Sequence, residues 1–486
     1  MLSLYRGLSM LTRTRLLLVT TALLYIAVGV AAEDAAPTQA PRLLSEPREV
    51  PDDPPGVAAL PQKGARPARV ISFGSFTSVQ VNVASGGINV VGDAANEPSI
   101  AIDPTFPNHI AIGWRHFATI TSNFRQAGYG YSRDGGRTWT APGPLDPTVF
   151  RSDPVLAFAA DGTFYYNSLS VVATSFTCEV FKSANAGMTW GPPIQAQGGD
   201  KAWMTVDRTG GMGHGHVYSA WSNAAGCCGN FTFTRSVDAN ITWESASSIP
   251  FLPRWGTMDV APNGDLWIIG VDNTGTRILA SCSIDAQDAS IIPPLFFTTS
   301  ENLGGTVVAG VLGSPNPVGL LGQVWIAVDK SSGPTAGWIY VVASVDPATS
   351  DPLDVHFMRS TDNGFTWSTP VRLNDDPLTT AWSWMATMSV APNGRIDVVW
   401  NDTRNTGIAN HSQLFYTSSS NGGSAWTTNE QLSPTWDSYL GWPNKEKIGD
   451  YYHMVSDDVG AHLAQVEALR VDVEDVPELA PGHQVA

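Results

Sequence analysis

One eight-residue pattern recurs five times along the chain and limits what the chain can fold into. The pattern is Ser-x-Asp/Asn-x-Gly-x-Thr-Trp, and Asn240 takes the place of the glycine in the third copy. The copies are SRDGGRTW (132–139), SANAGMTW (183–190), SVDANITW (236–243), STDNGFTW (360–367) and SSNGGSAW (419–426). A segment that recurs at a regular interval indicates a repeat architecture. We therefore assign these octets to the fold before asking whether they carry chemistry.

A second repeated feature has the same period. Successive octets start about fifty to sixty residues apart, except for one gap of about twice that length, which predicts a repeat that has lost its octet. Two apolar strands around a turn recur seven times, and the fourth pair falls inside the long gap. VAPNGD (260–265) and VAPNGR (390–395) are nearly identical, which indicates duplication. The pairs lie at 98–114, 153–167, 202–221, 257–270, 324–343, 384–400 and 451–466.

Repeats of this length with Gly/Asp turns predict an all-β fold, a β-propeller built from four-stranded antiparallel blades. Abundant glycine (46 residues) and tryptophan (17) suit short strands joined by tight turns. We count seven blades, with six as the alternative if the closing units merge. Strands near 69–83 can supply the outer edge of the last blade, which closes the ring and protects its edges.

The two ends of the chain differ in composition from the repeats. Residues 1–32 combine early arginines with an apolar run and small residues, which predicts a signal peptide, with an uncleaved anchor as the alternative. Residues 33–68 are rich in Pro, Ala and charge and predict a disordered linker before a propeller at 69–470. Residues 471–486 predict a flexible tail. We expect a secreted, periplasmic or cell-surface protein with no other membrane segment.

Charge and metal-ligand spacing exclude several functions. The net charge of −17 argues against a nucleic-acid partner, because no basic stretch could replace phosphate counterions. Adjacent Cys227 and Cys228 lack the spacing of a zinc site, so we expect them to staple a loop. We expect no metal and no cofactor. Asp375 and Asp376 (LNDDP) would suit a structural calcium ion, although a capped turn explains them equally well.

Polar residues concentrate at the positions that would ring one mouth of the channel. They lie just before innermost strands or directly after second strands of the repeats, as in GWRH (113–116) and WNDTRN (400–405). Charged clusters are structural as often as functional, so the position alone does not assign a role. The residues are Glu97, Arg115, Arg151, Asp153, Asp200, Arg254, Asp402, Arg404 and Asp450.

The octets resemble the Asp-box, or BNR repeat, of sialidase-like propellers. The resemblance extends from about residue 70 to 466 and includes EPSIAIDP, WNDTRN and IGDYYHM. It implies that each octet forms the turn between the third and fourth strands of a blade, on the face away from an active site. The Asp or Asn would accept backbone N–H bonds, the glycine would take a positive φ, and the tryptophan would plug the space between sheets.

The same resemblance implies the residues of a glycosidase. Sialidases hold the sugar carboxylate with three arginines, for which Arg115, Arg254 and Arg404 are the candidates and Arg151 the reserve. A tyrosine paired with a glutamate is the nucleophile, and Tyr451 with Glu446 are the candidates. We assign the general acid to Asp153 or Glu97. Asp200, Asp402 and Asp450 complete the predicted substrate-binding set.

Two hypotheses follow from the sequence. The first, which we favour, is an exported exo-α-sialidase-type glycoside hydrolase that acts on terminal acidic sugars of a glycan or glycoprotein. The second is a non-catalytic propeller that binds a protein or glycan through its channel face. The Phe-Arg-Ile-Pro sequence that opens sialidase propellers is absent, which favours the second. A third, an endo-acting hydrolase, would need two carboxylates across an open cleft. We expect a monomer.

Overall fold

The computed structural model describes residues 53–54, 67–90, 92–172, 175–377, 380–443 and 447–466. The predicted signal peptide (1–32), nearly all of the predicted linker (33–68) and the predicted tail (471–486) lie outside these residues. Within the described ranges the chain forms strands and turns, and it contains no helix long and apolar enough to cross a membrane.

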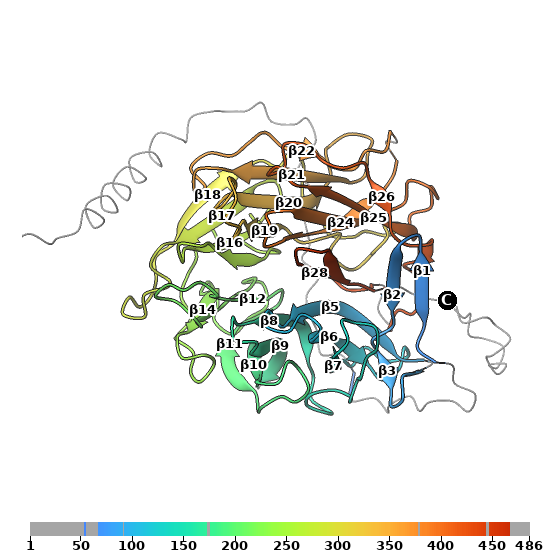
Figure 1. Ribbon diagram of the computed structural model, residues 1–486, viewed down its shortest axis with the longest axis horizontal. Coiled ribbons are helices and arrows are strands. Elements are labelled where there is room, and N and C mark those ends of the chain that lie inside the picture. The colour runs from blue at the N-terminus through green and yellow to red at the C-terminus, as the bar shows by residue number, and fades with distance from the viewer. Residues whose placement is uncertain are drawn as a thin grey trace, which may run out of the picture. The chain divides into compact units, whose positions relative to one another are not determined.

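The described residues form a β-propeller of six blades, in which sequential strands pair antiparallel from the centre outward (Figure 1). Blade 1 contains β5 (Ala94–Ile102), β6 (Ile110–Phe117) and β7 (Gln126–Ser132), and blade 2 contains β8 (Ser152–Phe158), β9 (Phe164–Val172), β10 (Ser175–Ser183) and β11 (Ile194–Gln197). Blade 3 contains β12 (Trp203–Val206), β13 (Val217–Ala220) and β14 (Phe233–Ser236), and blade 4 contains β15 (Met258–Val260), β16 (Leu266–Val271), β17 (Ile278–Ser283) and β18 (Phe297–Glu301). Blade 5 contains β19 (Trp325–Val328), β20 (Ile339–Val345), β21 (Asp354–Ser360) and β22 (Val371–Arg372), and blade 6 contains β23 (Ser383–Val390), β24 (Ile396–Asp402), β25 (His411–Ser419), β26 (Glu430–Gln431) and β27 (Trp436–Asp437).

The number of strands differs between blades. Blades 2, 4 and 5 have the expected four, blades 1 and 3 have three, and blade 6 has five. In blades 1 and 3 the outer edge is reduced to single bridges, between Tyr131 and Thr140 and between Phe233 and Ser247. The prediction of four strands in every blade is therefore not confirmed.

The ring closes through a smaller sheet. β28 (His453–Ser456) and β29 (Ala461–Ala464) pair only with each other among the described strands, and β28 packs against β23 on one side and β5 on the other. Figure 1 shows β28 near the centre, between the blade 6 strands and β5. A seventh four-stranded blade is therefore not confirmed, and six blades, the alternative, are present.

Two hairpins precede blade 1 in the chain, and the first of them contacts the closing sheet. β1 (Val70–Phe73) pairs with β2 (Phe76–Val79), and β3 (Val83–Ala84) pairs with β4 (Ile88–Asn89). The Gln465 side chain donates a hydrogen bond of 3.4 Å to Ser78 Oγ, which joins the β1–β2 hairpin to the closing sheet. The expectation that residues 69–83 extend that sheet as its outer edge is not met by a strand ladder in the described residues.

Each octet begins at the last residue of the third strand of its blade, at Ser132, Ser183, Ser236, Ser360 and Ser419. In all five copies the serine Oγ accepts a hydrogen bond of 2.8–2.9 Å from the backbone N–H four residues later. In all five the Asp or Asn Oδ1 accepts one of 2.9 Å from the N–H four residues after it. These bonds satisfy the turn's own backbone, so the octet is architecture.

Blade 4 shows what remains of a lost octet. After β17, Ser283 Oγ donates a 2.8 Å hydrogen bond to Asp285 Oδ1 and accepts one of 3.0 Å from the N–H of Ala286. The first half of the octet geometry therefore persists at 283–286 without the glycine or the tryptophan. This explains the long gap between the third and fourth octets.

The octet tryptophans, expected to be buried between blades, are half-buried and pack on the hydrophobic cores between blades. Trp426, between β25 and β26 of blade 6, meets the ring of Phe357 in blade 5 edge-on, with the ring centroids 4.9 Å apart. Trp190, between β10 and β11 of blade 2, meets Tyr129 in blade 1 in the same way at 6.1 Å. Each of these octets therefore fastens its blade to the preceding one.

Candidate functional site

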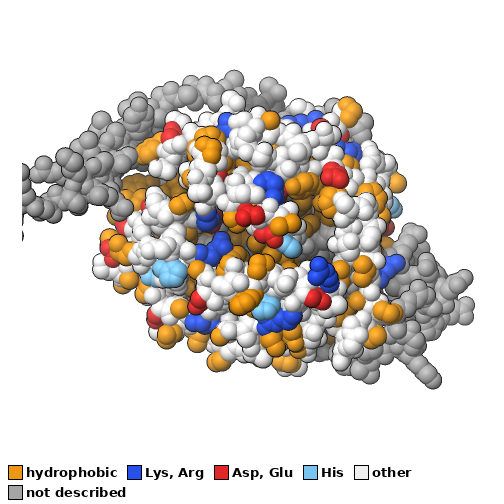
Figure 2. Space-filling view, viewed as in Figure 1, with side chains coloured by type: hydrophobic (Ala, Val, Ile, Leu, Met, Phe, Trp, Pro, Cys, Tyr) orange, Lys and Arg blue, Asp and Glu red, His pale blue; other side chains and the backbone are white. Residues whose placement is uncertain are grey.

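Charged side chains of both signs surround the centre of the face shown in Figure 2. A separate, buried set of charged residues lies where the innermost strands begin. There the backbone enters the left-handed region at the same place in three successive blades, at Glu97 (φ 49°), Asp153 (φ 47°) and Lys201 (φ 58°). In β5 and β8 the strand register shifts at this point, which marks a bulge. Bulges re-aim side chains, and they are common beside functional sites.

Two lysines hold the acids of this buried ion network together. Lys201 Nζ lies 2.7 Å from Asp450 Oδ2 and 3.1 Å from Asp200 Oδ1. Lys447 Nζ lies 2.9 Å from Asp450 Oδ2 and 3.6 Å from Glu97 Oε1. All five side chains are at most 4% exposed. The network therefore joins the first and third blades to the closing sheet.

Arg115 and Asp153 complete the network. Arg115 Nε lies 3.2 Å from Glu97 Oε2 and donates a 2.6 Å hydrogen bond to Asn96 Oδ1. Asp153 Oδ2 accepts a 2.7 Å hydrogen bond from the backbone N–H of Lys201. Four carboxyl groups thus face three cations in a space closed to solvent.

Burial and pairing set the charge of this network. Burial raises the pKa of Glu97 well above its usual value despite the nearby Arg115 and Lys447. Burial would also raise the pKa of Asp450, but Lys201, Lys447 and Arg115 hold it well below the usual value. Burial acts to lower the pKa of Lys201, and four carboxyl groups raise it well above. Glu97, Asp450 and Lys201 therefore depart from their usual pKa values because burial and pairing act on them together.

Tyr451 lies inside the same cluster. Its Oη donates a 2.8 Å hydrogen bond to the Pro154 carbonyl, and its ring packs edge-on against Trp203 at 5.3 Å. Burial raises the pKa of Tyr451 well above its usual value, and the negative charges of Glu97 and Asp153 raise it further. A phenol in this setting resists deprotonation.

The predicted site residues therefore separate into two groups. The structure brings together Glu97, Arg115, Asp153, Asp200, Asp450 and Tyr451. Arg115, Arg254 and Arg404, the predicted clamp, are each held by different partners. Arg254 donates a 2.8 Å bond to the Asn273 carbonyl and lies over the Trp255 ring. Arg151 pairs with Asp146 at 2.8 Å and with Glu179 at 2.6 Å.

Arg404 is engaged by acids. Its guanidinium lies 2.8 Å from Asp402 Oδ2 and 2.7 Å from Asp375 Oδ1, and it covers the Phe415 ring at 4.2 Å. Asp376 Oδ1 is 3.5 Å away. Asp402 is fully buried. The predicted pairing of Arg404 with a sugar carboxylate would have to displace these carboxylates.

The same contacts bear on the calcium ion that Asp375 and Asp376 would suit. Asp375 is taken up by Arg404, and Asp376 Oδ1 accepts a 2.8 Å hydrogen bond from the Asn374 side chain beside Arg372 at 3.4 Å. Carboxylates paired with arginines do not fit a divalent cation. Across the described residues, no group of three or more His, Cys, Asp or Glu side chains is placed to hold a metal ion.

Glu446 lies outside the described residues, so the structure assigns it no place. Sequence reasoning overlooked Lys201 and Lys447. Each was signalled by a neighbouring acid, in GGDKAW and in KIGD. A lysine close to an acid at an innermost-strand start is a signal that could have found them.

Little space remains beside the network. A recess of about 10 Å³ is lined by Asn96, Arg115, Arg125 and Lys447, among other residues. That volume accommodates about one water molecule. The Arg125 Nη1 atom donates a 2.6 Å hydrogen bond to the Asn123 carbonyl, and the guanidinium lies over the Phe150 ring at 4.8 Å. No sugar ring could enter here without rearrangement of the surrounding chain.

A disulfide joins the adjacent Cys227 and Cys228 in the loop between β13 and β14. This loop supports the network, since the carbonyl of Ala225 accepts a 2.7 Å hydrogen bond from the N–H of Asp200. Cys227 N–H donates a 3.1 Å bond to the Gly198 carbonyl. The expectation of a stapled loop therefore agrees with the geometry.

Comparisons with known proteins give structural likeness at low identity. No family model and no curated protein sequence matches the chain. A protein of unknown function from Dyadobacter fermentans is 14% identical with a TM-score of 0.41, covering 75% of this chain and 90% of its own. A Hadza microbial sialidase is 15% identical with a TM-score of 0.36, covering 71% and 72%. The Aleuria aurantia lectin, solved with a fucosylated sugar, is 13% identical with a TM-score of 0.39, covering 70% and 96%. Likeness at this level does not extend to activity or ligand.

Proposed function

We propose that this chain is a non-catalytic binding propeller whose channel face takes an acidic glycan. The observation that supports this most is the closure of the ion network. Its side chains are at most 4% exposed, they are paired with one another, and the recess beside them has a volume of about 10 Å³. A general acid or nucleophile must reach the bond that it breaks, and these groups do not reach solvent.

The charge of the side chains that line the small recess supports an acidic ligand. Arg115, Arg125 and Lys447 all contribute to its lining. Guanidinium and ammonium groups attract carboxylates, and the attraction is stronger where water is scarce. A glycan carboxylate placed over this recess would meet these cationic side chains while the sugar ring stays on the face outside.

The hydrolase is the second candidate, and one observation favours it. Tyr451, Glu97, Asp153 and Arg115 lie close enough for their charges to act on one another, as a sialidase-type mechanism would need. In that mechanism a carboxyl group takes the phenol proton while Tyr451 attacks the sugar, and Asp153 protonates the leaving oxygen. The chain around the network would have to open first. Export to the cell surface or beyond is part of both proposals.

One titration separates the two functions. We expect sialyllactose to bind the purified protein in calorimetry, lactose to bind at least tenfold more weakly, and no free sialic acid to appear. Released sialic acid that disappears in Tyr451→Phe would establish the hydrolase and overturn the binding proposal. Equal affinity for lactose and sialyllactose, or no binding of either, would overturn the acidic-glycan ligand.

A further inference from the structure

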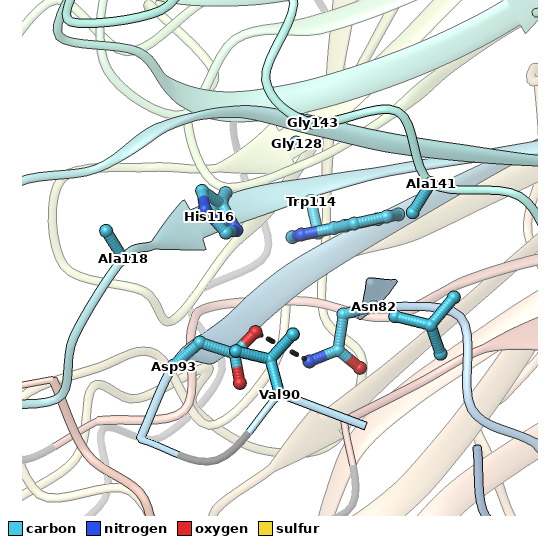
Figure 3. Close-up of a pocket in the computed structure, with 10 residues that line it drawn as sticks. Asn82, Val90, Asp93, Trp114, His116, Ala118, Gly128, Ala141 and Gly143 are labelled. Atoms are coloured by element: carbon cyan, nitrogen blue, oxygen red, sulfur yellow. Dashed lines mark hydrogen bonds between the residues drawn. The ribbon is translucent and has the colours of Figure 1, made fainter. Parts of the chain in front are cut away.

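A second, larger cavity lies away from the ion network, between blade 1 and the β3–β4 hairpin. Its volume is about 100 Å³. Figure 3 shows Trp114 and His116 side by side on β6, with Asp93 and Asn82 across the space from them. The remaining lining consists of glycine, alanine and valine residues. Protein interiors rarely leave voids larger than a water molecule, so a space of this size needs an explanation.

The fold explains why the space exists. Elsewhere in the ring a blade packs against the sheet of its neighbour, but beside blade 1 the closing sheet has only two strands among the described residues. The short β3–β4 hairpin contributes Val83 to the lining of the space. Gly128 on β7 also keeps the space available for the large side chains. A Cβ there would stand 2.4 Å from Trp114 Nε1 and 2.8 Å from His116 Cβ.

The cavity contains polar groups that the protein does not satisfy. Trp114 lines the cavity and is 5% exposed, and its buried Nε1–H has no hydrogen-bond partner among the residues that the structure describes. Buried N–H groups are nearly always bonded, so an orphan beside a cavity points to an absent acceptor. Asp93 accepts one long hydrogen bond of 3.5 Å, from the Asn82 side chain. Carboxylates normally take several shorter ones.

The described lining of the cavity contains a carboxyl group but no lysine or arginine. Asp93 and His116 are the titratable groups among its described lining residues, and neither lysine nor arginine lines it. Burial lowers the pKa of His116 to about 4, so the imidazole is neutral near pH 7. Burial raises the pKa of Asp93 to about 7, which is the expected effect when a carboxylate lacks a cation. The site therefore lacks a positive charge.

We propose that this cavity binds a small organic ammonium ion that carries a hydroxyl group, such as choline. The ammonium group would lie against the Asp93 carboxylate and the Trp114 indole, because an aromatic face and a carboxylate together attract a desolvated cation. The hydroxyl oxygen would accept the hydrogen bond that Trp114 Nε1–H offers. A cavity of about 150 Å³ holds benzene, so about 100 Å³ suits the trimethylammonium end of such a ligand.

The choice of probe separates charge from shape. 3,3-Dimethyl-1-butanol has the same heavy-atom skeleton as choline, with carbon in place of the ammonium nitrogen. By calorimetry at pH 8, where Asp93 is ionised, we expect choline to bind at least tenfold more tightly than this alcohol. Asp93→Asn keeps the side-chain volume and should weaken choline binding at least tenfold. Asp161→Asn, at an exposed turn of blade 2, is the matched control and should change nothing.

A second readout locates the ligand. In a ¹H–¹⁵N spectrum of the indole groups, the Trp114 Nε1–H resonance, assigned by its loss in Trp114→Phe, should shift on addition of choline. Equal affinity for choline and its neutral analogue, or no shift of this resonance at saturating choline, would overturn the proposal. Neither outcome bears on sialyllactose binding, because the two sites share no lining residue.

Discussion

Lys201 and Asp450 form a buried ion pair, with 2.7 Å between Nζ and Oδ2. Lys201 stands just before the innermost strand of blade 3, and Asp450 stands just before β28 in the closing sheet. Both side chains are at most 1% exposed. The pair therefore ties together segments from opposite halves of the chain across the centre of the propeller.

Removal of one member of this pair should strongly destabilise the fold. Lys201→Ala leaves Asp450, Asp200 and Asp153 with less compensation in a space closed to water. Loss of one partner of a buried ion pair costs about 3–5 kcal/mol of unfolding free energy. Urea unfolding of the variant measures this, with Arg137→Ala on an exposed octet as the control. A loss below about 1 kcal/mol would mean that water reaches the network.

Arg404→Ala should act on stability and leave glycan binding unchanged. Arg404 stands between the buried acids Asp402 and Asp376, so its removal leaves both carboxylates short of a cation. We expect a loss of about 2–4 kcal/mol in urea unfolding. Sialyllactose affinity, measured below the unfolding range, should stay within twofold of the wild type. A stable variant that no longer binds the sugar would restore Arg404 to the predicted clamp.

The octet glycines give a test with an internal control. Gly364 has φ 76°, and a Cβ there would come 2.3 Å from the Trp267 ring in the preceding blade. Gly74, in the turn between β1 and β2, has φ 59° and nothing within 4 Å of a Cβ. Both Gly→Ala changes impose backbone strain of about 1–3 kcal/mol, but only Gly364→Ala adds overpacking of about 1–3 kcal/mol. Equal losses for the two variants in thermal unfolding would contradict the close contact between blades.

Asp93 and His116 should have opposing effects on the pH dependence of stability. The folded-state pKa of Asp93 is raised from 3.8 to about 7, so its contribution to stability is lost as the pH rises through that window. The pKa of His116 is lowered from 6.5 to about 4, so its contribution is lost as the pH falls through that window. Between about pH 4 and 6.5 Asp93 and His116 change the free energy of unfolding with pH in opposite directions, and the two changes cancel in the wild type.

Replacing Asp93 or His116 singly should reveal how the remaining group makes the free energy of unfolding depend on pH. In urea unfolding between pH 4.5 and 6.5, Asp93→Asn should become more stable as the pH rises, relative to the wild type. His116→Gln should become less stable over the same range. A difference of one pKa unit corresponds to about 1.4 kcal/mol, so the divergence is large enough to measure. Parallel profiles for the two variants would show that the two groups are not buried as described.

The octet repeat accounts for much of the architecture through local interactions. Its serine, its Asp or Asn and its glycine act locally, because every hydrogen bond that forms the turn lies within eight residues. Asn240 illustrates this in the third copy, where it takes φ 68° as glycine does in the others. The side chain then gains a longer-range use, since its amide donates a 3.0 Å bond to the Val180 carbonyl in the preceding blade. The sequence predicted the tolerance at this position but not that bond.

The charged residues could be located from the sequence, but their partners could not. The positions of Glu97, Asp153, Asp200 and Asp450 before innermost strands were enough to place them at one mouth of the channel. Whether a charged group there faces a ligand or another side chain depends on contacts between residues far apart in the chain, such as Lys201 with Asp450. The three predicted arginines have different partners for the same reason.

The β-propeller repeat can be predicted from the sequence, because strand periodicity and turn chemistry are encoded within each unit of about fifty residues. The closure of the ring depends on tertiary contacts, which place a two-strand sheet beside blade 1 in place of a full blade in the part of the chain that is described. Tertiary contacts also pair the central charged residues with one another, and they place a Trp114 with an unsatisfied N–H beside a cavity between blade 1 and the β3–β4 hairpin. Closure, burial and charge balance depend on how distant segments fill a shared space, and no local pattern specifies that.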